Sequence, residues 1–84
     1  MKKVVMYTSR YCPFCVRAKQ LLLEKKASLK ELFVDQDPEL RQKMMQKSGR
    51  HTVPQIWIGE QHIGGCDELL ALDRANKLDG LFSS

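Results

Sequence analysis

Two cysteines separated by two residues, Cys12 and Cys15, are the residues of this 84-residue chain whose types and spacing point most directly to chemistry. Thiols at this spacing can interconvert between a dithiol and a disulfide. Only a thiolate attacks a disulfide, and an unperturbed cysteine is about 3% thiolate at pH 7. The surroundings of the pair therefore decide whether it reacts at neutral pH.

An apolar run precedes the pair, and a helical pattern follows it. Residues Val4–Thr8 are apolar or β-branched, as in a strand buried on both faces. Pro13 suits the first turn of a helix, which we expect to extend to about Lys26. Cys12 then lies directly before a helix, where unpaired N–H groups and the helix dipole stabilise a negative charge.

The two thiols are predicted to have different roles. We expect Cys12 to be the exposed thiolate nucleophile, with Arg10 and Arg17 near enough in sequence to add to the positive field. Cys15 lies on the inward stripe of the helix with Ala18, so we expect it to be more buried and to have the higher pKa. That suits a resolving thiol, which attacks a mixed disulfide formed on its partner.

The rest of the chain alternates between strand and helix patterns. Leu32–Val34 predicts a second strand. Asp37 and Pro38 predict an N-cap and first turn of a helix that ends at Gly49. The later segments are a strand over Gln55–Ile58, a type II′ turn at Gly59-Glu60, a strand over Gln61–Ile63, a break at Gly64-Gly65, and a helix from about Cys66 or Asp67 that buries Leu69, Leu72 and Ala75.

The element order is βαβαββα. The early βαβ unit predicts parallel pairing, and the late hairpin predicts antiparallel strands in the same sheet. We therefore expect an α/β fold in which helices flank a four-stranded mixed sheet. A chain of this length is expected to form one domain, residues 1–84.

Composition limits the classes of function. The chain is 43% hydrophobic and 29% charged, and it has no segment near the ~20 apolar residues of a membrane span. We expect a cytoplasmic protein without a membrane or nucleic-acid partner, because the basic residues behind its net charge of +4 are scattered rather than interleaved with aromatics. Part of that charge could face an anionic small molecule. Three cysteines in a reducing compartment favour chemistry over structural disulfides.

Two further segments leave alternatives open. Val53-Pro54 precedes a strand, and only about 5–6% of X-Pro bonds are cis, so a proline that simply opens a strand is the plainer interpretation. Gly64-Gly65-Cys66-Asp67 could let a ligand approach the backbone and hold a carboxylate at a helix N-terminus. It could equally be a glycine turn with Asp67 capping its helix.

Taken together, three motifs resemble those of a dithiol glutaredoxin of the short bacterial type. They are Cys12-Pro13-Phe14-Cys15, Thr52-Val53-Pro54-Gln55-Ile56 and Gly64-Gly65-Cys66-Asp67-Glu68, and the resemblance covers essentially the whole chain. It implies a thioredoxin-like fold, a cis bond at Val53-Pro54, and glutathione as reducing co-substrate. No metal and no tightly bound cofactor are expected.

The resemblance also implies a set of glutathione-binding residues. The Val53 backbone would pair with the cysteinyl part, and N–H groups near Cys66 and Asp67 would receive the γ-glutamyl carboxylate. Arg41 and His51, or alternatively Arg50, would meet the glycine carboxylate. The full implied set is Arg10, Phe14, Arg41, His51, Thr52, Val53, Pro54, Gly65, Cys66 and Asp67.

Two positions depart from the family pattern. The family usually has lysine three residues before the nucleophile, whereas this chain has Ser9 there and Arg10 next to it. The residue before the second cysteine is commonly tyrosine and here is Phe14, which lacks the hydroxyl. We expect activity to survive both changes.

The activity so implied is glutathione-dependent reduction of protein disulfides and glutathione mixed disulfides. Its partners would be glutathione and disulfide-containing or glutathionylated proteins, with ribonucleotide reductase as one candidate, and the protein is expected to be a monomer. Three alternatives remain: a redoxin supplied by thioredoxin reductase, a zinc-binding interaction module using Cys12, Cys15, His62 and Cys66, and an iron–sulfur carrier.

Overall fold

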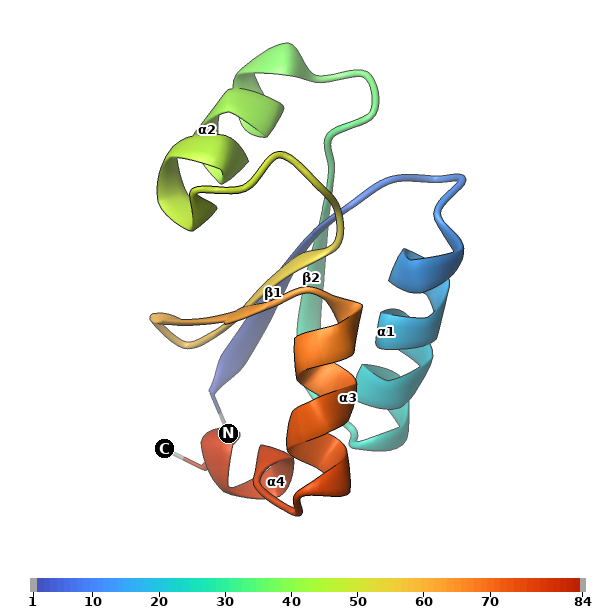
Figure 1. Ribbon diagram of the computed structural model, residues 1–84, viewed down its shortest axis with the longest axis vertical. Coiled ribbons are helices and arrows are strands. Elements are labelled where there is room, and N and C mark those ends of the chain that lie inside the picture. Colours follow the sequence, from blue (N-terminus) through green and yellow to red (C-terminus); the bar gives the residue numbers. More distant parts are fainter. Residues whose placement is uncertain (1, 84) are drawn as a thin grey trace.

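The computed structural model describes residues 2–83 and shows one layered α/β unit (Figure 1). The elements of the described chain are β1 (Lys3–Thr8), α1 (Pro13–Glu24), β2 (Ser28–Phe33), α2 (Pro38–Ser48), β3 (Gln55–Ile58), β4 (Gln61–Gly64), α3 (Cys66–Arg74) and α4 (Leu78–Leu81). The predicted order βαβαββα is confirmed, with one short helix added at the end.

The strands form a four-stranded mixed sheet in the order β2-β1-β3-β4. Strand β1 pairs with β2 in parallel and with β3 antiparallel, and β3 pairs with β4 antiparallel. This is the predicted mixture. Gly59 has φ 61°, the positive value that the first position of a type II′ turn requires.

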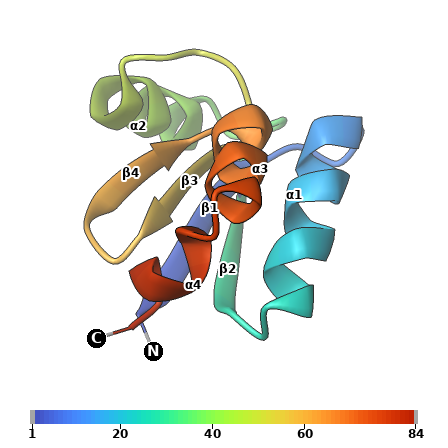
Figure 2. The same cartoon turned by 60° about the horizontal axis from the view of Figure 1, so that its bottom comes forward.

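Helices cover both faces of the sheet. Figures 1 and 2 show α1 and α3 side by side on one face and α2 on the other. The face under α1 and α3 holds the larger core, in which Val4, Met6 and Leu69 are fully buried. The smaller core under α2 includes Tyr7 and Met44. Alternate residues of β1 thus enter opposite cores, as the period of a strand requires.

Local signals fix the starts of the first two helices. Cys12 has an extended backbone before Pro13 of α1, and Asp37 accepts a hydrogen bond from the Leu40 N–H, 3.1 Å away, at the start of α2. Gly49 ends α2 with φ 72°, as predicted. Helix α1 ends at Glu24, two residues before the predicted end.

The second strand, β2, is longer than predicted and begins earlier in the sequence. It runs from Ser28 to Phe33, so it begins four residues before the predicted Leu32, and Val34 follows it. The cause is its place at the edge of the sheet. Its residues are exposed or half-buried, and therefore it lacks the apolar run that marked β1.

The C-terminal region also differs from the prediction. Strand β4 includes Gly64, and α3 ends at Arg74, which leaves Ala75 exposed rather than buried. Leu72 is half-buried. Helix α4 instead brings Leu78 and Phe82 into the larger core. None of the helices in residues 2–83 is long and apolar enough to span a membrane.

Candidate active site

The sulfur of Cys12 acts as the N-cap of α1. Its backbone is extended, with φ −127° and ψ 106°, and its Sγ accepts a hydrogen bond from the Cys15 N–H at 3.2 Å. In this position a sulfur faces the free N–H groups of the first helical turn. Because the acceptor is a thiol group, the cap is also a reactive atom, and Cys12 is half-buried rather than fully exposed as predicted.

Cys15 lies one turn further along α1 and is buried, with 2% of its surface exposed. Burial, and then the hydrogen bond with Cys12, raise the pKa of the Cys15 thiol to about 11. Cys15 is therefore a neutral thiol at pH 7. The predicted contrast in burial between an accessible first cysteine and a buried second one is confirmed.

The loop before β3 lies against the nucleophile. The Val53-Pro54 bond is cis, as the resemblance implied. The carbonyl oxygen of Val53 is 3.9 Å from the Sγ of Cys12, although the two residues are 41 positions apart in sequence. Pro54 is buried, while Val53 is partly exposed beside the sulfur.

A cavity of about 330 Å³ opens beside this loop. Its walls come from three separate segments, which are the first turn of α1, the loop into β3, and the start of α3. The lining residues are Phe14, Arg50, Thr52, Val53, Pro54, Gln55, Gly65, Cys66, Asp67 and Glu68. The three sequence motifs, far apart along the chain, thus meet around one cavity.

Seven of the ten residues predicted to bind glutathione line this cavity. They are Phe14, Thr52, Val53, Pro54, Gly65, Cys66 and Asp67. The other three lie elsewhere. The Nε of Arg10 is 4.0 Å from a carboxylate oxygen of Asp35, and Arg10 lines a different cavity of about 240 Å³. The Nη1 of Arg41 donates to the His51 carbonyl at 3.2 Å, and neither residue lines the first cavity.

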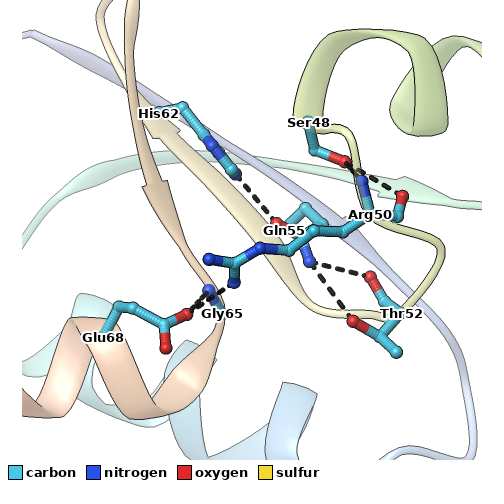
Figure 3. Close-up of polar contacts among 7 residues, drawn as sticks. All are labelled: Ser48, Arg50, Thr52, Gln55, His62, Gly65 and Glu68. Carbon is cyan, nitrogen blue, oxygen red and sulfur yellow. Dashed lines mark hydrogen bonds and ion pairs between the residues drawn. The ribbon is translucent and has the colours of Figure 1, made fainter.

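Two lining residues, Arg50 and Glu68, contact each other in the cavity wall. Figure 3 shows Arg50 extending toward Glu68, whose Oε1 accepts from the Arg50 Nη1 at 2.9 Å and from the Gly65 N–H at 2.6 Å. The Gly65 N–H, and then Arg50, hold the pKa of Glu68 below its usual value. No role of Glu68 was predicted from the sequence. The signal that could have identified it is the capping-box spacing, a glutamate three residues after an N-cap residue.

Gln55 is the other lining residue that sequence reasoning missed. It is fully buried, and its amide contacts Thr52 on one side and His62 on the other (Figure 3). His62 also packs against Trp57, with ring centroids 4.6 Å apart. His62 is thus engaged in β4, and residues 2–83 contain no group of three or more His, Cys, Asp or Glu side chains placed to hold a metal. The four ligands of the zinc alternative do not assemble.

Cys66, the third thiol, begins α3 and is buried. Burial raises the pKa of the Cys66 thiol, and the neighbouring Asp67 raises it further. Its position in the cavity wall gives it a part in shaping the site, whereas Cys12, the less buried thiol, lies outside the lining and next to Val53.

Comparison with known proteins gives one consistent result. A family model described as Glutaredoxin matches residues 4–63. The chain is 56% identical over 84 residues to a glutaredoxin of Pseudomonas aeruginosa, covering all of both chains. It is 52% identical over 81 residues to Glutaredoxin 3 of Escherichia coli K12, covering 96% of this chain and 98% of the relative.

Solved structures agree in fold. A dithiolic glutaredoxin from Trypanosoma brucei brucei superposes with a TM-score of 0.88 at 41% identity, over 98% of this chain and 88% of that one. A buckwheat glutaredoxin, solved as a complex with glutathione, has a TM-score of 0.88 at 31% identity, over 96% and 76% of the two chains.

Proposed function

Because this chain belongs to the glutaredoxin family and is a thiol–disulfide oxidoreductase of that type, we propose that glutathione is its reductant and Cys12 its nucleophile. Its substrates are glutathionylated proteins and protein disulfides. The observation that carries the proposal is the position of the Cys12 sulfur. It faces a helix N-terminus and stands beside a loop that forms a wall of a cavity large enough for a small peptide.

Deglutathionylation uses one thiol of the protein. The Cys12 thiolate attacks the glutathione sulfur of a mixed disulfide, so that a bond between Cys12 and glutathione forms and the client leaves as a thiolate, which takes up a proton. A second glutathione thiolate then attacks the sulfur of the bound glutathione. Oxidised glutathione leaves, and the Cys12 thiolate is regenerated.

Reduction of a protein disulfide uses both thiols. Cys12 attacks one client sulfur and forms a mixed disulfide, and the other client sulfur leaves. Cys15 then gives up its proton to the leaving client sulfur and attacks the sulfur of Cys12, which releases the reduced client as a thiol and leaves a Cys12–Cys15 disulfide. Two glutathiones reduce this bond and become one oxidised glutathione. The position of Cys15 one helical turn from Cys12, with its N–H 3.2 Å from the Cys12 sulfur, suits this intramolecular step.

The cavity offers groups that match the parts of glutathione. Val53 supplies backbone groups for the cysteinyl portion beside Cys12, and α3 presents its N-terminal N–H groups near Cys66 and Asp67 for the γ-glutamyl carboxylate. Arg50 is the cation in the cavity wall, so we assign the glycine carboxylate to Arg50 rather than to Arg41 or His51. The buckwheat relative, which was solved with glutathione, supports glutathione as the ligand of the cavity.

Protein clients are expected to approach over the apolar rim around the nucleophile. Tyr11 is 93% exposed and Phe14 61% exposed, and they flank Cys12 in sequence. Ribonucleotide reductase stays a candidate client on the resemblance alone, and the monomeric state and cytoplasmic location stay predictions.

A coupled assay tests the proposal. Reduction of a glutathionylated peptide and of a protein disulfide is followed with glutathione and glutathione reductase for the wild type, Cys12→Ser and Cys15→Ser. We expect Cys12→Ser to be inactive on both substrates. Cys15→Ser should keep deglutathionylation but lose most reduction of protein disulfides. Wild-type activity in Cys12→Ser, or turnover with thioredoxin reductase but not with glutathione, would refute the proposal.

A further inference from the structure

Gln55 is a fully buried polar side chain at the start of β3, with 0% of its surface exposed. A buried primary amide destabilises the fold unless its donors and its acceptor all have partners. Gln55 meets this condition. Its Nε2 lies 3.0 Å from the Thr52 carbonyl oxygen and 3.4 Å from the Thr52 Oγ1, and its Oε1 lies 2.8 Å from the His62 Nε2.

These partners fix which way the amide faces. The carbonyl oxygen of Thr52 can only accept, so the group facing it must be the NH₂ of Gln55. The Oε1 of Gln55 then faces His62, which must donate from Nε2. Burial lowers the pKa of His62, so this donor is the N–H of a neutral imidazole at pH 7. The close-up in Figure 3 shows the amide between these two partners.

The contact with Thr52 also sets the direction of the next N–H group. The carbonyl of Thr52 and the N–H of Val53 belong to one peptide unit, and the cis bond of this loop is the next one, Val53-Pro54. In a planar trans peptide the C=O and N–H bonds point in opposite directions. Because Gln55 holds the Thr52 carbonyl toward the interior, the Val53 N–H must point away from it.

Within residues 2–83 no hydrogen bond uses the N–H of Val53. Val53 lines the cavity, and its own carbonyl oxygen is 3.9 Å from the Cys12 sulfur. The Val53 N–H is therefore a donor with a fixed direction and, within residues 2–83, no hydrogen-bond partner. It lies next to the nucleophile.

We propose that Gln55 is a positioning residue for substrate binding: by bonding the Thr52 carbonyl, it holds the Val53 N–H toward the cavity as a donor for a backbone carbonyl of the bound glutathionyl group. This inference rests on the proposed function. It assigns the effect of Gln55 to binding and not to the reactivity of Cys12, since no hydrogen bond in residues 2–83 joins these two residues.

The test compares a variant that removes the Gln55 contacts to both Thr52 and His62 with a variant that removes only the contact to His62. Gln55→Met has a similar length but no amide, so it frees the Thr52–Val53 peptide. His62→Leu removes the partner of Oε1 and leaves both bonds to Thr52 in place. Each loses at least one buried hydrogen bond and should unfold at a lower temperature than the wild type.

Steady-state kinetics with a glutathionylated peptide separates the two variants. We expect Gln55→Met to raise KM about tenfold with kcat within twofold, because the donor acts equally in the ground state and the transition state. His62→Leu should keep KM within twofold. The rate at which iodoacetamide alkylates Cys12 should be the same in all three proteins, a result that general loosening of the site would not give.

Equal KM values in folded Gln55→Met and the wild type, or an equal rise in both variants, would overturn the inference. If Gln55→Met does not fold, hydrogen exchange in Cys15→Ser decides instead. Glutathionylation of Cys12 should slow exchange of the Val53 amide about tenfold or more, and unchanged exchange would overturn the inference.

A separate comparison tests the proposed function independently of the role of Gln55. Wild-type protein is assayed with the same peptide as a glutathione mixed disulfide and as a cysteine mixed disulfide. No preference for the glutathione form would refute the proposed function itself, whatever Gln55→Met does. A clear preference together with an unchanged KM in Gln55→Met would refute only the role of Gln55.

Discussion

Arg50 donates from Nη1 to Oε1 of Glu68 over 2.9 Å, and this ion pair links the loop after α2 to the first turn of α3. The same carboxylate oxygen accepts the Gly65 N–H at 2.6 Å. One oxygen atom therefore holds both the glycine turn at the start of α3 and the cation in the cavity wall. Both residues line the cavity, so the pair belongs to the site and not only to the fold.

Glu68→Gln tests how much the negative charge of this carboxylate contributes to the free energy of unfolding. The amide can still accept the Gly65 N–H, but the attraction to Arg50 is lost. Both side chains are about half exposed, so we expect a loss of only about 0.5 kcal/mol in the free energy of unfolding at pH 7.

The difference in unfolding free energy between the wild type and Glu68→Gln should decrease as the pH falls. The pKa of folded Glu68 is lowered from the usual 4.5, so its stabilisation is fully present above about pH 4.5 and is lost as the pH falls through the lowered pKa. Urea unfolding of wild type and Glu68→Gln from pH 7 downward should show the gap closing. A gap that stays constant into acid would contradict the assignment to charge.

Gly64 is predicted to be hard to replace. Its φ is 115°, and a Cβ built there would lie 2.5 Å from Oε1 of Glu68, the oxygen that holds the Gly65 turn. We expect Gly64→Ala to lower the free energy of unfolding by about 2 kcal/mol, from backbone strain together with displacement of Glu68. Gly80→Ala is the control, since nothing lies within 4 Å of a Cβ there. Chemical denaturation of both variants is the measurement, and equal stabilities would contradict this account.

The parts of the site that sequence predicted are those with local causes. Pro13 and the pattern behind it place a helix start, so the positions of Cys12 and Cys15 before and inside the first turn follow from a few neighbouring residues. The cis bond at Val53-Pro54 has no such local signal, because base rates favour trans. It was expected only through the resemblance of three motifs.

The parts that sequence did not predict depend on contacts between distant segments. Arg10 is next to the Cys12 motif in sequence, but its Nε lies 4.0 Å from Asp35, from the segment after β2, and it lines another cavity. Gln55 looked like an ordinary strand residue, and only the fold brings His62 and Thr52 to its two sides. Charge and polarity along the chain do not indicate which partner a side chain will meet.

The raised pKa of Cys15 predicts a loss of stability in alkali. Its thiol ionises near pH 11 in the folded protein, mainly because of burial, and near the usual 9.0 when unfolded. The stabilisation is therefore fully present below about pH 9 and is lost as the pH rises toward 11. In Cys15→Ala this component, of the order of 2 kcal/mol, should be absent. Unfolding free energies of both proteins from pH 8 to 10.5 check this, and parallel curves would contradict it.

Arg50 and Arg10 form a matched pair for testing which cation meets the carboxylate of the proposed glutathione ligand. Each is an exposed arginine that contacts one carboxylate, Glu68 or Asp35, but only Arg50 lines the cavity beside Val53. A charged hydrogen bond to a ligand carboxylate is worth about 1.5 kcal/mol or more when formed, and Arg50 shares its charge with Glu68. We therefore expect Arg50→Ala to raise KM for a glutathionylated peptide about fivefold with little change in kcat.

Arg10→Ala should keep that KM within twofold, although it removes the same charge from the protein. The rise for Arg50→Ala should also shrink at high salt, because screening weakens the interaction of the wild type with the anionic ligand. Steady-state kinetics at 0.05 and 0.5 M salt for the three proteins measures both effects. An equal rise for the two variants would mean that net charge, and not the position of Arg50 in the cavity wall, determines how the ligand is attracted.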